Sequence, residues 1–219
     1  VKWFILSFII SFAFNWIINA IKTAYNLVTV LVPTATGKTG LAANLAVKID
    51  GEIISADSRQ VYRSMDLGTG KDYDDYFVDG REIPSHLVDI EDPGVHYNVY
   101  RFQADFIKVF EEIQQREKMP VLCGGSGLYL EAVLKNYNLI QVPPNKKLRK
   151  ELEGKSLEEL TQILNDLKPE LHNKTDVETD RRAIRAIEIE MYYRENPEID
   201  TSMPEIRSLN IGVNFDRET

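Results

Sequence analysis

The chain has 219 residues, enough for one sizeable α/β domain or for such a domain with an insertion. Its 43% of hydrophobic residues can bury a core, while the formal net charge of -8 argues against a broadly basic surface for nucleic acid and leaves room only for a local patch. The single cysteine, Cys123, excludes an internal disulfide and fits a reducing compartment, and three scattered histidines offer no zinc-ligand spacing.

An uncharged apolar stretch occupies residues 3–21 and is flanked by Lys2 and Lys22. It is long enough to span a bilayer as a helix, which takes about 20 residues, and no small-residue cleavage site follows it. The alternative is a spurious extension from a mistaken start, because the chain begins with Val1 rather than methionine. We treat residues 1–22 as a separate segment and expect a cytoplasmic protein, with a membrane anchor as the less favoured interpretation.

Short apolar runs alternate with helical patterns over residues 23–136. The pattern predicts strands at residues 26–32, at 51–58, at 83–90 and from 119 into a glycine turn, and helices at 38–49, 98–118 and from 128. Strands that alternate with helices predict a parallel sheet covered on both faces. Together with the phosphate-loop motif described below, this predicts an α/β core of the P-loop NTPase type. The helical spacing predicts core stripes at Leu41, Leu45 and Ile49, and at Phe102, Phe106, Val109 and Ile113.

The character of the chain changes at residues 137–205, which are highly charged, helical in pattern and without a predicted strand. Pro143 and Pro144 mark the beginning of this region, and Ser156 with Glu159 forms the pattern of a capping box. Strand character returns at residues 209–215. We therefore expect a helical insertion at 137–205, after which residues 206–219 return to the core as its last strand.

The first predicted strand runs into "VPTATGKT", residues 32–39, which resembles the phosphate loop G-x-x-x-x-G-K-[ST] except that Val32 replaces the first glycine. Loop amides and the helix N-terminus would cradle an anion, Lys38 would add a charge, and the hydroxyl of Thr39 suits Mg²⁺. The alternative is a chance match in an ordinary strand–helix turn. The predicted phosphate-binding residues are Thr34, Ala35, Thr36, Gly37, Lys38 and Thr39.

Two further strand ends carry candidate site residues. Asp57 follows the second strand, where a carboxylate can act as a base or a metal ligand, or alternatively cap the next helix. Gly124, Gly125, Ser126 and Gly127 follow the strand that starts at residue 119. Paired glycines permit close backbone approach to a ligand, but for this stretch taken alone plain turn chemistry is the favoured interpretation.

Basic residues cluster at two places in the predicted insertion. Arg182 and Arg185 lie three apart with Arg181 beside them, which suits phosphates or a nucleic-acid backbone. The alternative is a solvated face paired with Asp180 and Glu188. The same two interpretations apply to a second basic run, which consists of Lys146, Lys147, Arg149 and Lys150.

Six stretches together resemble the ordered motifs of the tRNA dimethylallyltransferases, also called tRNA isopentenyltransferases: "PTATGKT", "ISADSRQVY", "GTGK", "HLVDI", "CGGSGLYL" and "DRRAIRAIEIE". The resemblance covers residues 26–219, and the ordered set is far more specific than any single motif. The chain departs from the family at Val32 and in the apolar N-terminal segment, and the family's chains continue past residue 219.

The resemblance implies transfer of a dimethylallyl group from its diphosphate to the exocyclic N6 of an adenosine beside the tRNA anticodon. The phosphate loop would then hold a diphosphate leaving group, with Mg²⁺ on Thr39, rather than the γ-phosphate of ATP. Asp57 matches the family's general base and Arg217 its diphosphate-contacting arginine. The implied tRNA-binding residues are Asp57, Ser58, Arg59, Gln60, Ser126, Arg181, Arg182 and Arg185.

Other functions remain open on the sequence alone. A small-molecule P-loop kinase would use the same loop to bind ATP. An enzyme that prenylates free adenine nucleotides is closer to the family but would not need the helical insertion. A truncated remnant with Val32 in its loop would be inactive.

Overall fold

The computed structural model describes residues 15–31, 37–71, 73–137, 139–168, 177–198 and 203–212. The chain forms two compact units, Val1–Asn138 with Met203–Thr219, and Leu139–Ser202. We call the first the α/β unit and the second the helical unit. The predicted boundaries at 137 and 205 lie close to these limits, and their interpretation as domain boundaries stays a prediction.

A parallel sheet forms the centre of the α/β unit, with its strands in the order β5-β2-β6-β1-β7. The strands are β1 (Leu27–Leu31), β2 (Gly51–Ser55), β5 (Ser85–His86), β6 (Met119–Cys123) and β7 (Ser208–Gly212). Val121 of β6 is in register with Val28 of β1 on one side and with Ile53 of β2 on the other. The predicted parallel α/β arrangement is therefore confirmed.

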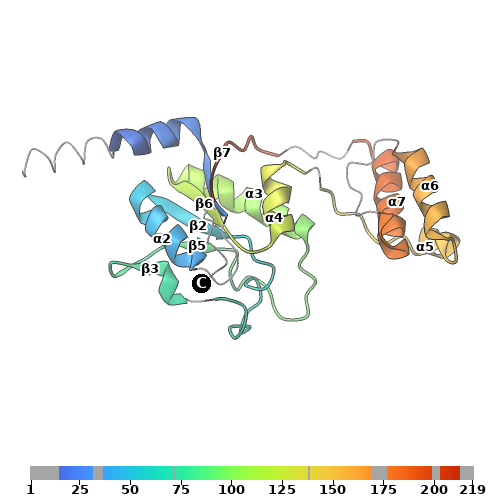
Figure 1. Ribbon diagram of the computed structural model, residues 1–219, viewed down its shortest axis with the longest axis horizontal. Coiled ribbons are helices and arrows are strands. Elements are labelled where there is room, and N and C mark those ends of the chain that lie inside the picture. The colour runs from blue at the N-terminus through green and yellow to red at the C-terminus, as the bar shows by residue number, and fades with distance from the viewer. Residues whose placement is uncertain are drawn as a thin grey trace, which may run out of the picture. The chain divides into compact units, whose positions relative to one another are not determined.

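Helices cover both faces of this sheet (Figure 1). Residues on one face of the sheet, such as Ile54 and Leu122, pack against α3 (Val99–Gln115) and α4 (Gly127–Leu134). Residues on the other face, such as Ile53 and Val121, pack against α2 (Lys38–Ile49). Because successive side chains of a strand point to opposite faces, the continuous apolar runs of the sequence fill two cores at once.

Two predicted core stripes need correction. In α2 the buried residues are Ala42, Ala43, Ala46 and Ile49, whereas Leu41 is 41% exposed. Small alanines let this helix approach the sheet closely, so the larger Leu41 points outward, while the predicted Leu45 is partly buried against the same core. In α3 the predicted Phe102, Phe106 and Ile113 are buried, but Val109 is only partly buried and Phe110 takes its place.

The predicted strand at residues 83–90 is mostly wrong, because only Ser85–His86 joins the sheet. Leu87 and Asp89 have positive φ angles of 62° and 54°, which interrupt an extended backbone. The sequence pattern also gave no prediction for the hairpin of β3 (Phe77–Val78) and β4 (Arg81–Glu82), or for the short 3₁₀ helix η1 (Tyr73–Tyr76) before it. The Asp79-Gly80 pair, both with positive φ, is the turn signal that could have found the hairpin.

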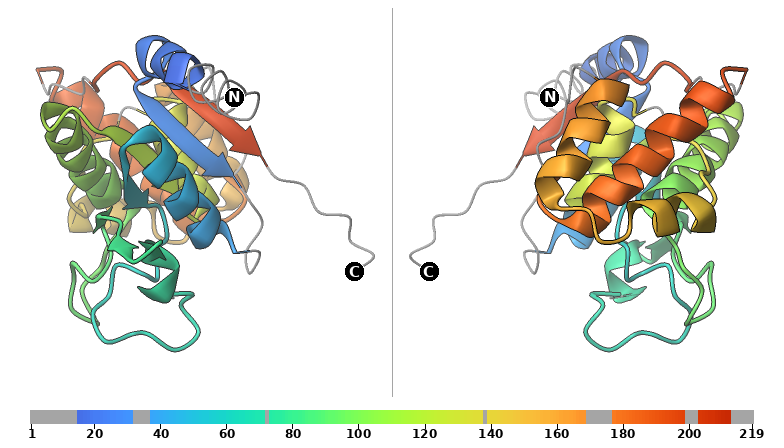
Figure 2. Two further views of the ribbon diagram at one scale, coloured as in Figure 1. Left: turned by 90° about the vertical axis from the view of Figure 1, so that its left-hand side faces the viewer. Right: turned by 90° about the vertical axis from the view of Figure 1, so that its right-hand side faces the viewer.

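The helical unit contains α5 (Lys146–Leu152), α6 (Leu157–Leu167) and α7 (Asp180–Glu195), which pack around Leu160, Leu164, Ala183 and Ile187. The expected capping box is present, with the Ser156 hydroxyl accepting the Glu159 N–H and the Glu159 carboxylate accepting the Ser156 N–H. The described residues of this unit contain no strand, as predicted. Figure 2 shows α6 and α7 side by side.

The apolar N-terminal stretch is described only from residue 15, and residues 15–24 are helical. Ile18 and Ile21 pack against the core on the α2 side of the sheet, while Trp16 and Ile17 are exposed. Among the residues that the structure describes, no helix is both long and apolar enough to cross a membrane.

Candidate active site at the carboxyl edge of the sheet

Helix α2 begins at the carboxyl end of β1 with the GKT part of the phosphate loop. Its N-cap residue, Gly37, has a left-handed backbone with φ 71° and ψ 27°, and no side chain caps the first amides of the helix. A helix start without a side-chain cap leaves N–H groups that an anion can accept. Lys38 and Thr39, both partly buried, are the first two residues of the helix. The predicted loop residues Val32, Thr34, Ala35 and Thr36 lie outside the described residues.

Asp57 lies just past the carboxyl end of β2 and is only 6% exposed. Its Oδ1 accepts the N–H of Arg59 at 3.0 Å. This local bond is the capping contact that the alternative interpretation expected, but residues 58–61 form a turn and not a helix. The bond therefore fixes the orientation of the carboxylate, which leaves a role for Asp57 as a base open to test.

The carboxyl ends of β2 and β6 are joined directly. The Ala56 N–H donates to Cys123 O at 2.8 Å and the Ser126 N–H donates to Ala56 O at 3.0 Å. The Ser126 hydroxyl accepts the N–H of Ser58 at 2.9 Å and donates to the Ser58 hydroxyl at 3.1 Å. Two residues predicted to contact tRNA thus meet across neighbouring strands.

The glycine turn after β6 has a structural explanation. A Cβ on Gly124 would lie 2.1 Å from Ala56 O, far inside any allowed contact. Gly124 therefore permits a backbone–backbone approach between two strand ends. Gly124 is required by this contact with the protein's own backbone, and the prediction that the glycine turn approaches a ligand stays a prediction.

Of the predicted tRNA-facing segment 57–60, only Arg59 is exposed. Gln60 is buried, and both ends of its amide are occupied. Its Oε1 accepts the Ser55 hydroxyl at 2.8 Å and its Nε2 donates to Gly70 O at 2.8 Å. The Gln60 side chain thus has the contacts of a structural residue, while the prediction that this segment faces tRNA remains to be tested.

Opposite charges surround the end of β6. Burial raises the pKa of the Cys123 thiol to about 12, Lys38 acts to lower it, and Asp57 acts to raise it. The same thiol lies 3.6 Å from Lys38 O. Lys38 and Asp57 therefore both lie near Cys123, the last residue of β6, and β6 lies between β1 and β2 in the sheet. The site has a cationic side at Lys38 and an anionic side at Asp57.

Tyr76 is a neighbour of this site that the sequence pattern did not single out. It is buried, and burial, Cys123, Asp75 and Asp57 together raise the pKa of its hydroxyl. The hydroxyl therefore stays protonated at neutral pH and keeps its O–H as a hydrogen-bond donor. No signal in "YDDYF" distinguishes it from a surface tyrosine.

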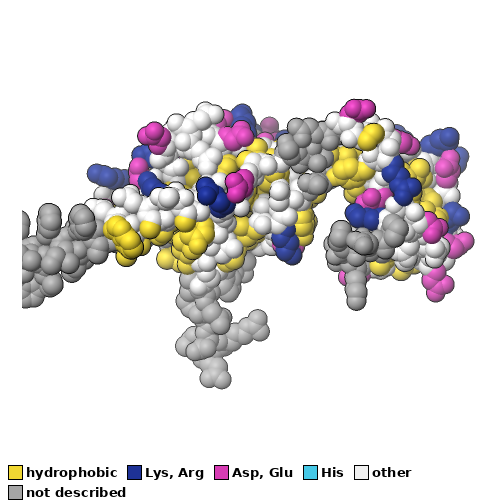
Figure 3. Space-filling view, turned by 90° about the horizontal axis from the view of Figure 1, so that it is seen from above, with side chains coloured by type: hydrophobic (Ala, Val, Ile, Leu, Met, Phe, Trp, Pro, Cys, Tyr) yellow, Lys and Arg dark blue, Asp and Glu magenta, His cyan; other side chains and the backbone are white. Residues whose placement is uncertain are grey.

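The predicted arginine cluster at the start of α7 divides into two kinds. Arg181 and Arg182 are exposed, and Arg182 pairs with Glu178 one turn earlier. Arg185 instead donates to Glu188 at 2.5 Å and to Val142 O at 2.9 Å. On the face shown in Figure 3, basic and acidic side chains of the helical unit are interspersed.

Glu188 binds two arginines of the helical unit, Arg149 and Arg185. Its side chain is 1% exposed and accepts two hydrogen bonds from Arg149, one from Arg185 and one from the Asn145 N–H. Burial alone would raise the pKa of Glu188, but these bonds outweigh it and lower the pKa to about 2. In the second basic run, Arg149 therefore has a structural partner in Glu188. Lys147 of the same run lies 3.9 Å from the Glu151 carboxylate.

No metal-binding group of three or more His, Cys, Asp or Glu side chains occurs in the part of the chain that the structure describes. Of the predicted site residues at the start of α2, Thr39 offers a hydroxyl, a type of oxygen ligand that suits Mg²⁺. Arg217 lies outside the described residues.

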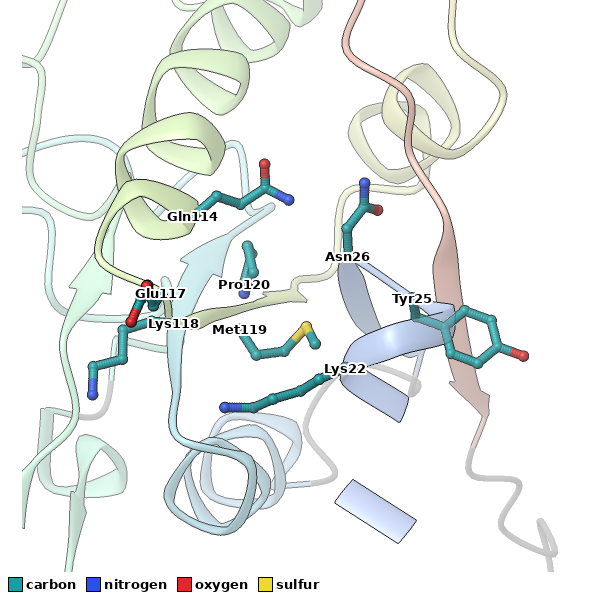
Figure 4. A pocket seen from close by; sticks show the side chains of 8 residues that line it. All are labelled: Lys22, Tyr25, Asn26, Gln114, Glu117, Lys118, Met119 and Pro120. Atoms are coloured by element: carbon teal, nitrogen blue, oxygen red, sulfur yellow. The ribbon is translucent and has the colours of Figure 1, made fainter. Parts of the chain in front are cut away.

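A cavity of about 220 Å³ opens at the opposite, amino-terminal edge of the sheet (Figure 4). Ligands of parallel α/β sheets bind at the carboxyl ends of the strands, so this cavity is not the candidate site. Lys118 on its wall bonds to the Asp50 carboxylate at 2.6 Å. The lining residues are Lys22, Tyr25, Asn26, Gln114, Glu117, Lys118, Met119 and Pro120.

Comparison with known proteins places the chain in a family. A family model described as IPP transferase matches residues 60–219, and the chain belongs to this family. It is 59% identical over 194 residues to tRNA dimethylallyltransferase 2 of Bacteroides fragilis, with 89% of this chain and 63% of the relative covered. It is 58% identical over 196 residues to tRNA dimethylallyltransferase 1 of Parabacteroides distasonis, with the same coverage of 89% and 63%. The chain thus spans about 63% of the length of these curated relatives.

Solved structures agree on the fold. A tRNA isopentenylpyrophosphate transferase from Staphylococcus epidermidis is 32% identical with a TM-score of 0.52, and the match covers 88% of this chain and 64% of that one. A eukaryotic dimethylallyltransferase described as acting on tRNA has a TM-score of 0.63 at 24% identity, over 85% of this chain and 48% of that one. These matches confirm the predicted fold class, a P-loop NTPase-like parallel sheet flanked by helices.

Proposed function

We propose that this chain is part of a tRNA dimethylallyltransferase, which modifies the N6 of an adenosine beside the anticodon. The names of its relatives support the class of reaction. The observation that carries the proposal is the position of Asp57, a nearly buried carboxylate at the carboxyl end of β2, near Lys38 and the start of α2. A base and a diphosphate site are then neighbours on one edge of the sheet.

The reaction needs a base on one side of the allyl donor and an anion site on the other. The adenine N6 attacks C1 of dimethylallyl diphosphate, a C–N bond forms, and the C–O bond breaks with its electron pair going to the diphosphate. Asp57 takes the proton that the nitrogen loses, as a general base does. Its bond from the Arg59 N–H holds Oδ1, so the proton would go to the other carboxylate oxygen.

The leaving diphosphate gains negative charge as the C–O bond breaks. Lys38 and the N–H groups at the start of α2 would stabilise that charge without needing to reorganise. Thr39 would hold Mg²⁺, which neutralises charge on diphosphate oxygens. Arg217, just after β7, would contact the same group.

The tRNA side of the proposal rests on local charge. Arg181 and Arg182 on α7 and Arg59 after β2 are exposed, so their guanidinium groups can reach phosphates. Ser126, whose hydroxyl bonds to Ser58 at the site, would lie beside the adenine of the tRNA. Because the adenosine must reach a recessed carboxylate, it has to leave its stack in the anticodon loop. We place this reaction in the cytoplasm, the compartment expected from the sequence.

One preparation of the full-length protein tests the proposal against its alternatives. Radiolabelled dimethylallyl diphosphate is offered with tRNA or with AMP, and ATP turnover is measured in parallel. Incorporation into tRNA alone supports the proposal. Incorporation into AMP would indicate a free-nucleotide enzyme, ATP turnover a kinase, and none of the three an inactive remnant.

A further inference from the structure

Lys71, the last residue of "GTGK", has a side chain with no exposed surface. Its ammonium group donates to Tyr62 O at 2.5 Å, to Asp89 Oδ1 at 2.5 Å and to Asp66 Oδ1 at 3.3 Å. An ammonium group has three donors, so the three acceptors satisfy it completely. A buried lysine is rare unless it is paired, and this one is paired on every side.

The three acceptors of Lys71 come from three separate stretches of chain. Tyr62 belongs to the turn after β2, Asp66 to the following loop and Asp89 to the segment after β5. Asp89 is fixed further, because the Tyr73 hydroxyl donates to its Oδ2 at 2.5 Å. Burial alone would raise the pKa of Asp89, but the bonds from Lys71 and Tyr73 outweigh it and lower the pKa.

The segment after β5 has a backbone that needs support. Leu87 and Asp89 have φ angles of 62° and 54°, in the left-handed region that a leucine rarely adopts. Such strain persists only where the surroundings impose it, and it is common near functional sites. The Lys71–Asp89 pair lies where this strained segment meets the turn after β2.

That turn is the one that holds Asp57. The Asp89 N–H donates to Gln60 O at 3.0 Å, and the Ile90 N–H donates to Val61 O at 2.9 Å. The same turn also holds the Asp57 carboxylate, because the Arg59 N–H donates to Asp57 Oδ1. A continuous path of bonds therefore runs from Lys71 to Asp57.

We infer that Lys71 is a positioning residue, which fixes the turn after β2 and thereby aims the Asp57 carboxylate at its substrate. The inference rests on the proposed function of Asp57 as a base. Lys71 is fully buried and saturated by the protein, so it does not contact the substrate itself. Its effect on the reaction passes entirely through the turn.

The test compares Lys71→Met with the wild type in the full-length protein and repeats the comparison in an Asp57→Ala background. We expect Lys71→Met to lower kcat for transfer to tRNA by roughly 10- to 100-fold, with KM for dimethylallyl diphosphate nearly unchanged. In the Asp57→Ala background the same substitution should lower kcat by less than about threefold, because its target is already gone.

Controls separate positioning from loss of folding. Glu52→Gln disturbs another buried carboxylate of the α/β unit, which bonds to Arg116 and His86 at the amino-terminal half of β2. It should lower thermal stability without a comparable loss of kcat. Asp89→Asn keeps the shape of its side chain and should reproduce the kcat loss of Lys71→Met, which guards against a single variant that fails to fold.

An equal loss of kcat in both backgrounds would overturn the inference, as would a loss no larger than that of Glu52→Gln. Amide hydrogen exchange provides a second measurement that does not depend on turnover: exchange at Asp89 and Ile90 should be about tenfold faster in Lys71→Met. Unchanged exchange would overturn the inference. Absence of transfer in the unmodified protein would instead overturn the proposed function.

Discussion

Gly124 and Ala56 lie so close at the ends of two neighbouring strands that a side chain on Gly124 would overlap the Ala56 carbonyl, 2.1 Å from its oxygen. The contact brings the turn that carries Ser126 onto the turn that carries Asp57 and Ser58. The geometry of the candidate site therefore depends on the absence of one methyl group.

Replacing Gly124 should disturb both stability and the site. We expect Gly124→Ala to lower the free energy of unfolding by about 3 kcal/mol, since the obstacle is backbone and cannot rotate away. Gly127→Ala is the matched control, because no heavy atom outside its chain neighbours and its own helix backbone lies within 4 Å of its Cβ position. Urea denaturation of both variants checks the difference, and equal midpoints would show that the strand ends can separate.

Asp57→Ala should slow transfer by roughly 10²–10⁴-fold while leaving donor and tRNA binding nearly intact, the usual range for loss of a general base. Single-turnover rates with bound substrates measure this directly. Asp57→Asn is the companion variant, since an amide keeps the bond from the Arg59 N–H but cannot accept a proton. Full activity in either variant would reduce Asp57 to a structural cap.

The two arginines of α7 should behave differently. Arg182→Ala removes an exposed side chain whose surface pair with Glu178 contributes about 0.5 kcal/mol or less, so it should weaken tRNA binding without loss of stability. The slope of log affinity against log salt should become shallower by about one unit or less. An unchanged slope would mean that Arg182 makes no phosphate contact and belongs to a solvated helix face.

Arg185→Ala should weaken tRNA binding and also destabilise the helical unit, because it leaves Glu188 and Val142 O short of donors. Thermal melting of the two alanine variants side by side distinguishes them. Equal melting temperatures would mean that Arg149 alone satisfies the buried carboxylate.

The Glu188 network predicts a pH dependence of stability. The folded-state pKa of about 2 lies below the ordinary value of 4.5, so the network stabilises fully above pH 4.5 and is lost as the pH falls toward 2. Glu188→Gln should cost about 3 kcal/mol at pH 7 and much less near pH 2. Urea denaturation of both proteins across this range measures the difference, and a constant gap would contradict it.

Val32 lies outside the described residues, so its prediction depends on the sequence alone. A valine forced into a glycine-type turn costs on the order of 1–3 kcal/mol. Val32→Gly in the full-length protein should therefore tighten dimethylallyl diphosphate binding at least several-fold, where about 1.4 kcal/mol corresponds to tenfold. A donor titration with Mg²⁺ decides, and equal affinities would show that the loop accepts valine.

Features of this protein that depend on local chemistry could be predicted from the amino-acid sequence alone. The apolar runs within β1, β2 and β6 predict buried strands because successive apolar residues, such as Ile53 and Ile54, meet both faces of the sheet. Ser156 and Glu159 predict a helix start because both partners of the capping box lie within one turn. Asp57, Lys38 and Ser126 could be proposed for one edge because parallel strands end together.

Contacts between residues that are far apart in the chain could be identified only from the folded structure. The pattern of α2 could not show that alanines rather than Leu41 face the sheet, because their fit depends on the distance between layers. The segment after β5 leaves the extended backbone at Leu87 and bonds through Asp89 and Ile90 to the turn after β2, and the pairing of Ser58 with Ser126 spans 68 positions. The motif "GTGK" includes Lys71, but the sequence does not show that its ammonium group is buried, because three folded segments supply its acceptors.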